Sequence, residues 1–392
     1  MAPRSTSAHG RRPGATTLAG LVLLVALIWS PAAGAQDTGA QDTGAGFCDR
    51  VRPGEVAGRV ADAGLEEISG LAASQVHDDV LWAQQDSGSA PELAAIDGSG
   101  ADLGRHPVPG AEAIDWEDLA VGPGPDPDLS YLYVGDIGDN GADRPSVTVY
   151  RVPEPSSPPT ADGAPLPGAE ALTLTYPGGP ADAEALLVDP RSGDLVIVTK
   201  EISGRSTVLE AAADSLVPGA PIEMTAVGEI EVPGPRLTPE NATLLPGTLV
   251  TGGDVSSTGD VVLLRTYRSV LAYERAEGES LSEALLGAPC FARQRNEPQG
   301  EAVAFSRDAT SYTTISEVQL ARQAGTAATG EGPAVHRFEV VAPDAPLPTA
   351  PPGVGEEEGR VPWWAVPLGL AAVVVLGLVG VVVLLRWRRR RR

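Results

Sequence analysis

Lysine is nearly missing from this sequence, which has one lysine, Lys200, among 392 residues and 28 basic side chains. Acidic residues number 52, and the formal net charge is −24. A protein that binds nucleic acid needs a basic surface to neutralise phosphates, so this balance argues against a nucleic-acid partner. The shortage of lysine beside an excess of Ala, Gly, Pro and Arg is typical of a GC-rich genome, and we expect no functional meaning in it.

Cysteine and histidine are also scarce. The chain has two cysteines, Cys48 and Cys290, and four histidines, none of which stands at ligand spacing from a cysteine. This argues against a zinc site. Outside the cytoplasm two cysteines favour a disulfide over free thiols. A bridge that closes a loop of about 240 residues is worth roughly 5 kcal/mol on the chain-entropy model.

The central part of the chain also lacks the apolar periodicity of helices. It consists of short β-rich runs between Gly, Pro and Asp turns. An all-β fold is therefore predicted. The clearest strands are expected at residues 80–83, 131–134, 147–150, 195–199 and 261–264.

A recurring sequence motif places an acidic residue before a short apolar strand. Copies at 67–72, 115–120, 182–187 and 300–304, with a looser copy at 251–256, lie about 50 to 70 residues apart. One four-stranded sheet per period predicts a β-propeller with five blades, or six if the longer intervals contain an unmarked one. A β-sandwich is the alternative, but it does not explain periodic acidic strand starts.

The first strand of every propeller blade lines the central channel, so the recurring acids should meet there. Two roles are open for them. Converging carboxylates suit calcium, which accepts six to eight oxygen ligands with loose geometry. Alternatively, the acids accept hydrogen bonds from backbone N–H groups of neighbouring blades. The acids in question are Glu67, Glu117, Glu184, Asp254 and Glu301.

The N-terminus has the pattern of a secretory signal peptide. Arginines at positions 4, 11 and 12 precede an apolar stretch at 18–29, and Ala33-Gly34-Ala35 supplies a small-x-small cleavage pattern. Residues 1–35 are therefore predicted to be removed, although an uncleaved N-terminal anchor is the alternative. Residues 36–47 contain a repeated five-residue motif and are expected to be a disordered spacer.

The C-terminus has the pattern of a membrane anchor. Residues 341–360 are rich in proline and include Glu356, Glu357 and Glu358, which predicts a stalk of up to about 60 Å. Residues 361–385 have no charged side chain and predict one transmembrane helix, and six of the residues at 386–392 are arginine. The ectodomain at 48–340 should then lie outside the plasma membrane, with the C-terminus in the cytoplasm.

Several motifs resemble the exported phytase-like and esterase-like β-propellers. They are residues 67–71, Trp82 with 86–88, 115–119, 135–140 and 299–302. The resemblance covers about residues 67–305 and implies a propeller with calcium among the five channel acids. Asp86, Asp115, Asp136, Asp139 and Asn140 would then lie near the channel mouth and bind ligand. The loop at 135–143 lacks the EF-hand pattern and is expected to be a tight turn rich in Asx side chains.

Phytase-like enzymes hold substrate phosphates with lysines and arginines, which are scarce here. We therefore expect a cell-surface binding module for a small ligand, glycan or protein partner. The alternative is a calcium-dependent extracellular hydrolase of the phosphoesterase or lactonase type, with water activated beside the metal. A propeller fold does not separate the two, because function belongs to the site.

Overall fold

The computed structural model describes residues 46–342, apart from residues 87, 162, 235–246, 296, 298 and 319–330. Regular structure in this part of the chain is nearly all β, as the sequence predicts. The predicted signal peptide, the spacer up to residue 45, the stalk from residue 343, the membrane span and the arginine tail lie outside the described residues. No helix within the described ranges is long and apolar enough to cross a membrane.

The described strands form five antiparallel sheets, which we number as blades 1 to 5. Blade 1 contains β2 (Ile68–Ala73), β3 (Val80–Gln85), β4 (Glu92–Asp97) and β5 (Asp102–Pro107). Blade 2 contains β6 (Trp116–Pro123), β7 (Ser130–Asp136), β8 (Val147–Pro153) and β9 (Glu170–Thr175), and the short β13 (Ile222–Glu223) pairs in parallel with β9. Blade 3 contains β10 (Ala183–Val188), β11 (Leu195–Thr199), β12 (Arg205–Ala211) and β14 (Thr225–Glu231).

Blade 4 contains β15 (Val250–Val255), β16 (Val261–Thr266), β17 (Ser269–Glu274) and β18 (Cys290–Ala292). Blade 5 contains β19 (Gly300–Phe305), β20 (Ser311–Ser316), β21 (Ala334–Glu339) and, from the start of the domain, β1 (Glu55–Arg59). The helices are short: η1 (Phe47–Arg50), η2 (Ala213–Ser215) and α1 (Leu281–Leu285). A Ser280 capping box begins α1.

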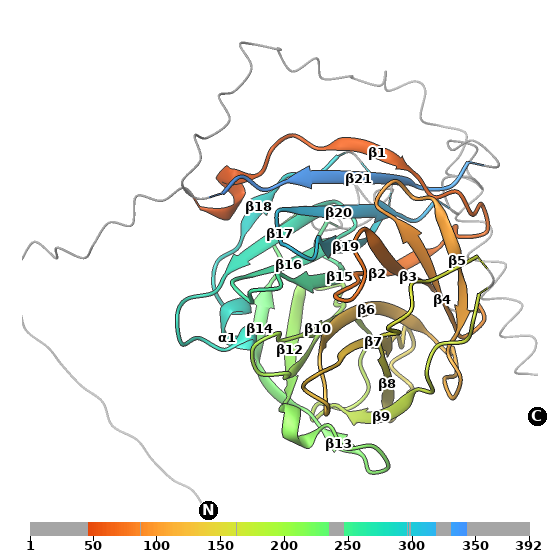
Figure 1. Ribbon diagram of the computed structural model, residues 1–392. Coiled ribbons are helices and arrows are strands. Elements are labelled where there is room, and N and C mark those ends of the chain that lie inside the picture. The colour runs from red at the N-terminus through yellow and green to blue at the C-terminus, as the bar shows by residue number, and fades with distance from the viewer. Residues whose placement is uncertain are drawn as a thin grey trace, which may run out of the picture. The chain divides into compact units, whose positions relative to one another are not determined.

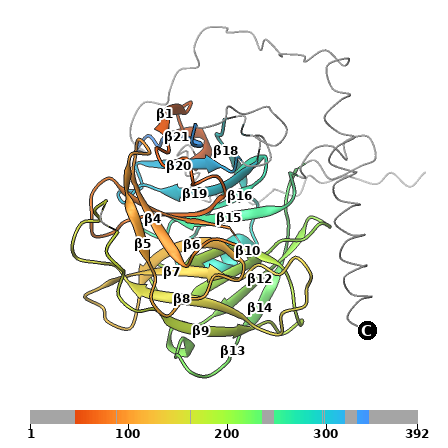
Figure 2. The same cartoon turned by 90° about the vertical axis from the view of Figure 1, so that its right-hand side faces the viewer.

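The blades are arranged as a ring around a central channel. The innermost strands β2, β6, β10, β15 and β19 each contact the next, and β19 contacts β2 (Figure 1). Within a blade the strands follow one another outward, as β6 to β9 do in Figure 2. The N-terminal β1 closes the ring as the outermost strand of the last blade. The protein is thus a five-bladed β-propeller, and the long intervals in the sequence contain loops and β13 but no sixth sheet among the described residues.

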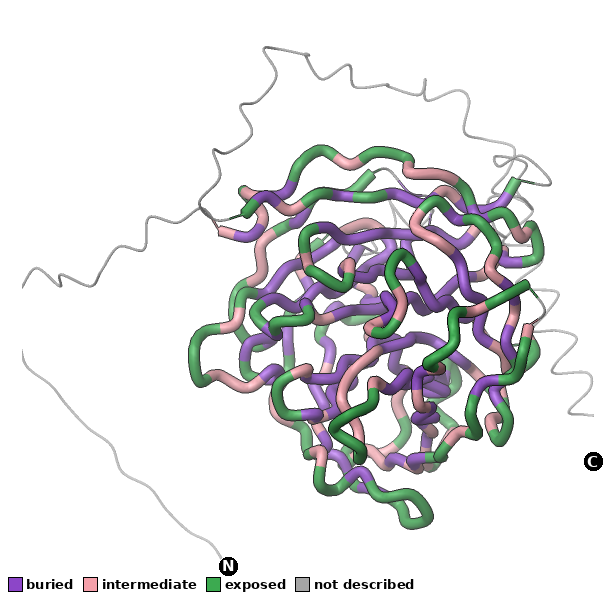
Figure 3. The backbone as a smooth tube through the Cα atoms, in the orientation of Figure 1, coloured by how far each residue is buried: buried purple, intermediate pink, exposed green. Residues whose placement is uncertain are grey.

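Apolar side chains hold neighbouring blades together. The buried residues form five clusters, and each lies between two adjacent sheets. Between blades 1 and 2, for example, Trp82 and Leu93 pack with Trp116 and Leu132. Figure 3 shows this distribution, with buried residues in the strands and exposed residues in the connecting loops. Burial on both faces explains why the strands have continuous apolar runs and not alternating ones.

The predicted disulfide between Cys48 and Cys290 is confirmed. It joins η1 to β18, with 6.2 Å between the two Cα atoms. The bridge therefore connects the outer edge of blade 4 to the N-terminal segment that leads into β1 of blade 5. Val51 and Val340 form a β-bridge just beyond it. Both features hold the two ends of the propeller together at the ring closure.

Candidate metal centre at the channel mouth

Each innermost strand has a β-bulge at its second residue. The pairing register with the second strand of the blade shifts at this point in all five blades. A bulge leaves one residue out of the ladder and re-aims its side chain. The residues in this position are Ser69, Glu117, Glu184, Thr251 and Glu301. Three of the five are glutamates, and the ring therefore brings these carboxylates to one end of the channel.

A cavity of about 180 Å³ lies at this end. Its lining has six carboxylates, one ammonium group and four neutral polar or aromatic side chains, and it contains no aliphatic residue. The lining residues are Glu67, Ser69, Asp86, Glu117, Asn140, Glu184, Lys200, Tyr267, Gln299, Glu301 and Glu317.

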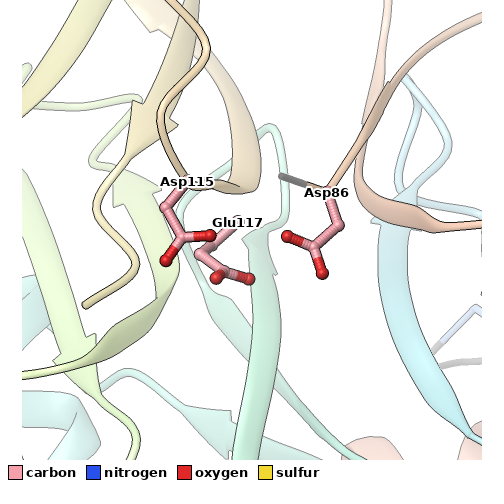
Figure 4. A group of neighbouring side chains, drawn as sticks. All are labelled: Asp86, Asp115 and Glu117. Atoms are coloured by element: carbon pink, nitrogen blue, oxygen red, sulfur yellow. The ribbon is translucent and has the colours of Figure 1, made fainter. Parts of the chain in front are cut away.

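Two overlapping groups of carboxylates have the spacing of metal ligands, with ligand atoms within 4.8 Å of one another. We name Asp86, Asp115 and Glu117 the outer group, and Glu117, Asp182 and Glu184 the inner group. The carboxylates of the outer group point toward one another in Figure 4. Glu117 belongs to both groups, so it can bridge two cation positions.

Glu117 is buried with little support from its surroundings. Its side chain is 4% exposed, and its carboxylate accepts no hydrogen bond from any residue that the structure describes. Burial, followed by the charges of Glu184 and Asp86, raises the pKa of Glu117 well above its ordinary value. A buried carboxylate without donors needs a proton or a cation. Burial, followed by the charges of Asp86 and Asp182, raises the pKa of Asp115 to about 6.

Glu184 in the inner group already has a cation beside it. Lys200 Nζ donates a hydrogen bond to Glu184 Oε1 and lies 5.3 Å from the centroid of the Tyr267 ring. Burial still outweighs the lysine, and the pKa of Glu184 is raised to about 8. Burial lowers the pKa of Lys200, but Glu184 and Tyr267 raise it, and the net shift is upward. Lys200 therefore places a positive charge in the cavity beside Glu184.

An amide binds two further carboxylates of the cavity. Gln299 Nε2 donates to Glu301 Oε1 at 3.0 Å and also to Glu317 Oε2. Burial, followed by the charges of Glu67 and Asp86, raises the pKa of Glu317 to about 7. Burial and then Glu184 raise the pKa of Glu301 well above its ordinary value. The pKa values of Glu184, Glu301 and Glu317 are thus all raised above that of free glutamate.

Asp118 lies just below the cavity and has a different role. Its carboxylate is fully buried and accepts hydrogen bonds from three backbone amides, Leu119 N at 2.9 Å, Leu186 N at 2.9 Å and Gly253 N at 3.0 Å. These amides belong to blades 2, 3 and 4, so one side chain ties three blades together. The equivalent positions in the other blades are the small residues Gly70, Ala185, Gly252 and Ala302. Asp118 therefore has room to reach across the channel.

The structure brings most of the sequence-predicted acids to the cavity. Glu67, Glu117, Glu184 and Glu301 line it together with Asp86 and Asn140, and Asp115 belongs to the outer group. Glu67, however, precedes the bulge residue of its blade by two positions, and Ser69 takes the equivalent place.

Asp254 is not brought to the cavity. It follows the bulge residue Thr251 by three positions, and its Oδ2 accepts a hydrogen bond from Phe305 N at 2.6 Å. This contact joins blade 4 to blade 5. Asp254 thus has the second role that the sequence leaves open, binding to the backbone of a neighbouring blade, and so does Asp118.

The loop after β7 is a turn rich in Asx contacts, as its sequence predicts. Asp136 accepts hydrogen bonds from Asp115 N and pairs with Arg144 at 2.8 Å, while Asp139 accepts from Arg144 N at 2.8 Å. These two carboxylates support the loop and are not among the cavity-lining residues. Gly138 brings the loop close to the outer group, because a Cβ there would lie 2.3 Å from Glu117 Oε1 and 2.6 Å from Asp115 Oδ2.

Sequence reasoning missed Lys200, Asp182, Tyr267, Gln299 and Glu317. The first two had a visible signal, since Lys200 is the single lysine and Asp182 stands two residues before Glu184. Gln299 likewise precedes Glu301 by two residues. Tyr267 directly follows β16 and Glu317 directly follows β20, each the second strand of its blade. No sequence pattern marks these two residues, because only the folded blades bring the ends of these strands to the channel.

The fold and the cavity define the chain as a five-bladed β-propeller with an acidic pocket at its channel mouth. No protein-family model matches the chain, and no curated protein sequence matches it. Among solved structures it is similar to one described as a luciferin-regenerating enzyme, at 10% identity and a TM-score of 0.37. That match covers 72% of this chain and 92% of the other chain. The resemblance to phytase-like and esterase-like propellers stays a prediction.

Proposed function

We propose that this chain is a membrane-anchored, cell-surface β-propeller that binds a divalent cation at its channel mouth and an extracellular ligand or protein partner at the face around it. The cation is of the calcium type. The membrane anchor and the outward orientation follow from the sequence of the two ends, and the binding role follows from the cavity.

One observation carries the proposal. Glu117 is 4% exposed, accepts no hydrogen bond from a described residue, and lies within 4.8 Å of Asp86 and Asp115. A structural carboxylate would have donors, as Asp118 has. Glu117 has no such donor among the described residues, and a cation at this position would neutralise three carboxylates at once.

The donor set favours calcium over a transition metal. The two groups offer only carboxylate oxygens, and Asn140 adds an amide beside them. Oxygen ligands suit hard cations, whereas imidazole and thiolate ligands select zinc or copper. Ca²⁺ tolerates irregular geometry and completes its shell with water, which suits ligands that come from three separate loops and strands.

A calcium titration of the metal-free full-length protein in detergent tests the proposal. Isothermal titration calorimetry should give saturable binding that Glu117→Gln abolishes. Glu277→Gln is the matched control, because this glutamate is exposed and outside the cavity. Wild-type protein without measurable calcium binding would rule out the cation site.

The proposed location has its own test. Protease added to intact cells should degrade residues 46–342, while an epitope placed after residue 392 stays protected. Degradation of the C-terminal epitope, with the propeller intact, would reverse the proposed orientation.

A hydrolase is the second candidate, and Glu317 favours it. This residue belongs to neither carboxylate group but lines the same cavity with a pKa of about 7. A general base works best with a pKa near the working pH, so Glu317 has the properties to accept a proton from a metal-bound water. Calcium-dependent cleavage of simple esters, lactones or phosphoesters that Glu317→Gln abolishes would favour the hydrolase, and its absence with intact calcium binding would favour the binding module.

A further inference from the structure

A cavity of about 440 Å³, which we name the side pocket, lies between blades 2 and 3. Its walls are the loop at residues 176–181, which leads from β9 to β10, and residues of β11, β12 and β14. Two of the lining residues, Ala181 and Thr199, directly precede Asp182 of the inner group and Lys200 of the channel cavity. Small-molecule sites have volumes of about 300–1,000 Å³. The side pocket therefore has the size of a ligand site and lies next to the proposed cation.

Part of the lining of the side pocket is apolar. The loop contributes Pro177 and Pro180, and blade 3 contributes Leu209 and Ala226. Tyr176 adds an aromatic ring, and its hydroxyl is buried without a hydrogen-bond partner among the described residues. Buried hydroxyls usually have a partner, and a ligand that carries a polar group can supply one here. This lining suits a ligand with an apolar body and a polar end.

The charged part of the lining is acidic. It consists of two carboxylates, Glu201 and Glu229, without a basic side chain among the described residues. Arg205 Nη2 donates to Glu229 Oε2 at 2.6 Å, so the charge of Glu229 is paired. The Glu201 carboxylate accepts no hydrogen bond and forms no ion pair within the described part of the chain. Burial, followed by the negative charges of Asp182 and Glu229, raises the pKa of Glu201.

We propose that the side pocket binds a small organic ammonium compound, with the ammonium group at Glu201 and the apolar body against Tyr176 and the prolines of the loop. The inference rests on the proposed function and adds to it the position and the chemical class of the ligand. A positive ligand compensates an unpaired carboxylate. A carboxylate or a phosphate ester would instead be repelled by Glu201 and by Asp182 beside it.

Three probes of nearly equal shape test the charge preference. They are 2-phenylethylammonium, the neutral 2-phenylethanol and the anion 3-phenylpropanoate, and equilibrium dialysis against the full-length protein in detergent measures their affinity, with detergent alone as the reference. The ammonium probe should bind about tenfold more tightly than the alcohol, because a hydrogen bond to a charged group is worth more than one between neutral groups. The anion should bind most weakly. Equal affinity for the three probes, or no saturable binding of the ammonium probe, would overturn the proposal.

Glu201→Gln tests the place of the ammonium group. The variant keeps the shape of the side chain and removes its charge, so the preference for the ammonium probe over the alcohol should disappear. Glu277→Gln is the matched control, because Glu277 is exposed and lines neither cavity, and it should keep the preference. A preference that survives in Glu201→Gln would place the ammonium group elsewhere and contradict the proposal.

Ala226→Phe tests the place of the apolar body without a change of charge. Ala226 is exposed on β14 and lines the side pocket, so a ring at this position should weaken the binding of the ammonium probe and the alcohol alike by about tenfold. Thr225→Phe is the control, since Thr225 is also exposed on β14 but does not line the pocket. Unchanged binding in Ala226→Phe would show that the probes bind outside the side pocket.

A lysine side chain of a partner protein offers the same ammonium group without an aromatic body. Nα-acetyl-lysine amide represents this source and should bind more weakly than 2-phenylethylammonium. Tighter binding of the lysine probe would assign the pocket to a protein partner and overturn the assignment to a free small molecule.

Calcium titration of the same proteins separates this inference from the proposed cation site. Glu201→Gln and Ala226→Phe should bind calcium as wild type does, because neither residue belongs to the two carboxylate groups. Calcium binding without binding of the ammonium probe would overturn this inference alone. Binding of the ammonium probe without calcium binding would overturn the cation site and leave the side pocket as a ligand site.

Discussion

Glu117 and Asp118 are neighbours in β6, are both buried and are both acidic, yet they belong to two regions of the channel with opposite properties. Glu117 lies in the cavity with no hydrogen-bond donor among the described residues, and Asp118 lies below it with three backbone donors. The difference comes from the β-bulge at Glu117, which turns the Glu117 side chain into the cavity and leaves Asp118 facing the backbone amides of blades 2, 3 and 4. A carboxylate saturated by amides supports the ring, whereas one without donors is available to a cation.

The region below the cavity should account for the largest effect on stability. Asp118→Ala leaves three buried N–H groups in blades 2, 3 and 4 without acceptors. At about 1–3 kcal/mol per unsatisfied buried group, the free energy of unfolding should fall by about 5 kcal/mol. Urea unfolding measures it. Asp118→Asn keeps a carbonyl acceptor and should lose less than half as much. Full stability of Asp118→Ala would mean that the three amides do not depend on this side chain.

Asp254 should give an effect that depends on pH. Burial raises its pKa from 3.8 to about 7, against the opposing effect of hydrogen bonds from Phe305 and Val255. The folded state therefore binds more protons than the unfolded state between these values, and the stability from this group is complete below pH 3.8 and is lost as the pH rises to about 7. Asp254→Asn does not titrate, so its stability relative to wild type should rise across this range by about 1.4 kcal/mol per pKa unit and level off above it.

The stability contributed by Asp308 should change with pH in the opposite direction to that of Asp254. Hydrogen bonds from Ser306 and Thr310 lower its pKa, so Asp308→Asn should lose stability relative to wild type as the pH rises through the acidic range. Unfolding curves at a series of pH values measure both variants. Equal slopes for the two variants would contradict the distinction between them.

The cavity should respond to calcium and the region below it should not. At a free calcium concentration of 100 times Kd, wild type should gain about 2.7 kcal/mol of stability, and a chelator should remove this gain. Glu117→Gln should lose the gain while its stability in chelator stays at least that of wild type, because the amide removes the cost of burying or protonating this carboxylate. Thermal unfolding with and without calcium measures it. A full calcium response in Glu117→Gln would place the ion elsewhere.

Gly138→Ala should have the smallest effect on stability and act on the cavity alone. Its Cβ would displace the Glu117 and Asp115 carboxylates, which are the ends of flexible side chains, so the fold should be nearly unaffected. Calcium affinity should fall by about tenfold, or about 1.4 kcal/mol. Gly178→Ala is the control, because a Cβ at that position meets nothing within 4 Å. Unchanged affinity in Gly138→Ala would mean that the outer group tolerates displacement.

The acidic strand starts predicted the propeller but not the register within it. The sequence aligned the copies on their acids, and the folded strands align on the bulge. Glu67 and Asp254 are therefore two and three residues away from the equivalent positions, which Ser69 and Thr251 occupy. An alignment on the small residue after the bulge, Gly or Ala in four blades, would have corrected this. Crowding of five strands around the axis demands small side chains there, as the 2.6 Å between a Cβ on Gly70 and Leu119 N shows.

The sequence by itself determined the all-β class, the repeated strand starts and the disulfide partners, because apolar runs, turn residues and a pair of cysteines are local or compositional features. The sequence also predicts a signal peptide and a membrane span. Only the tertiary structure decided which acids meet, since ring closure brings strand ends from residues 69 to 317 to one cavity. It also decided that no described residue donates a hydrogen bond to the Glu117 carboxylate, that three backbone amides donate to Asp118, and that Lys200 contacts Glu184. These facts depend on which backbone amides and side chains face each carboxylate, and such contacts across blades leave no pattern along the chain.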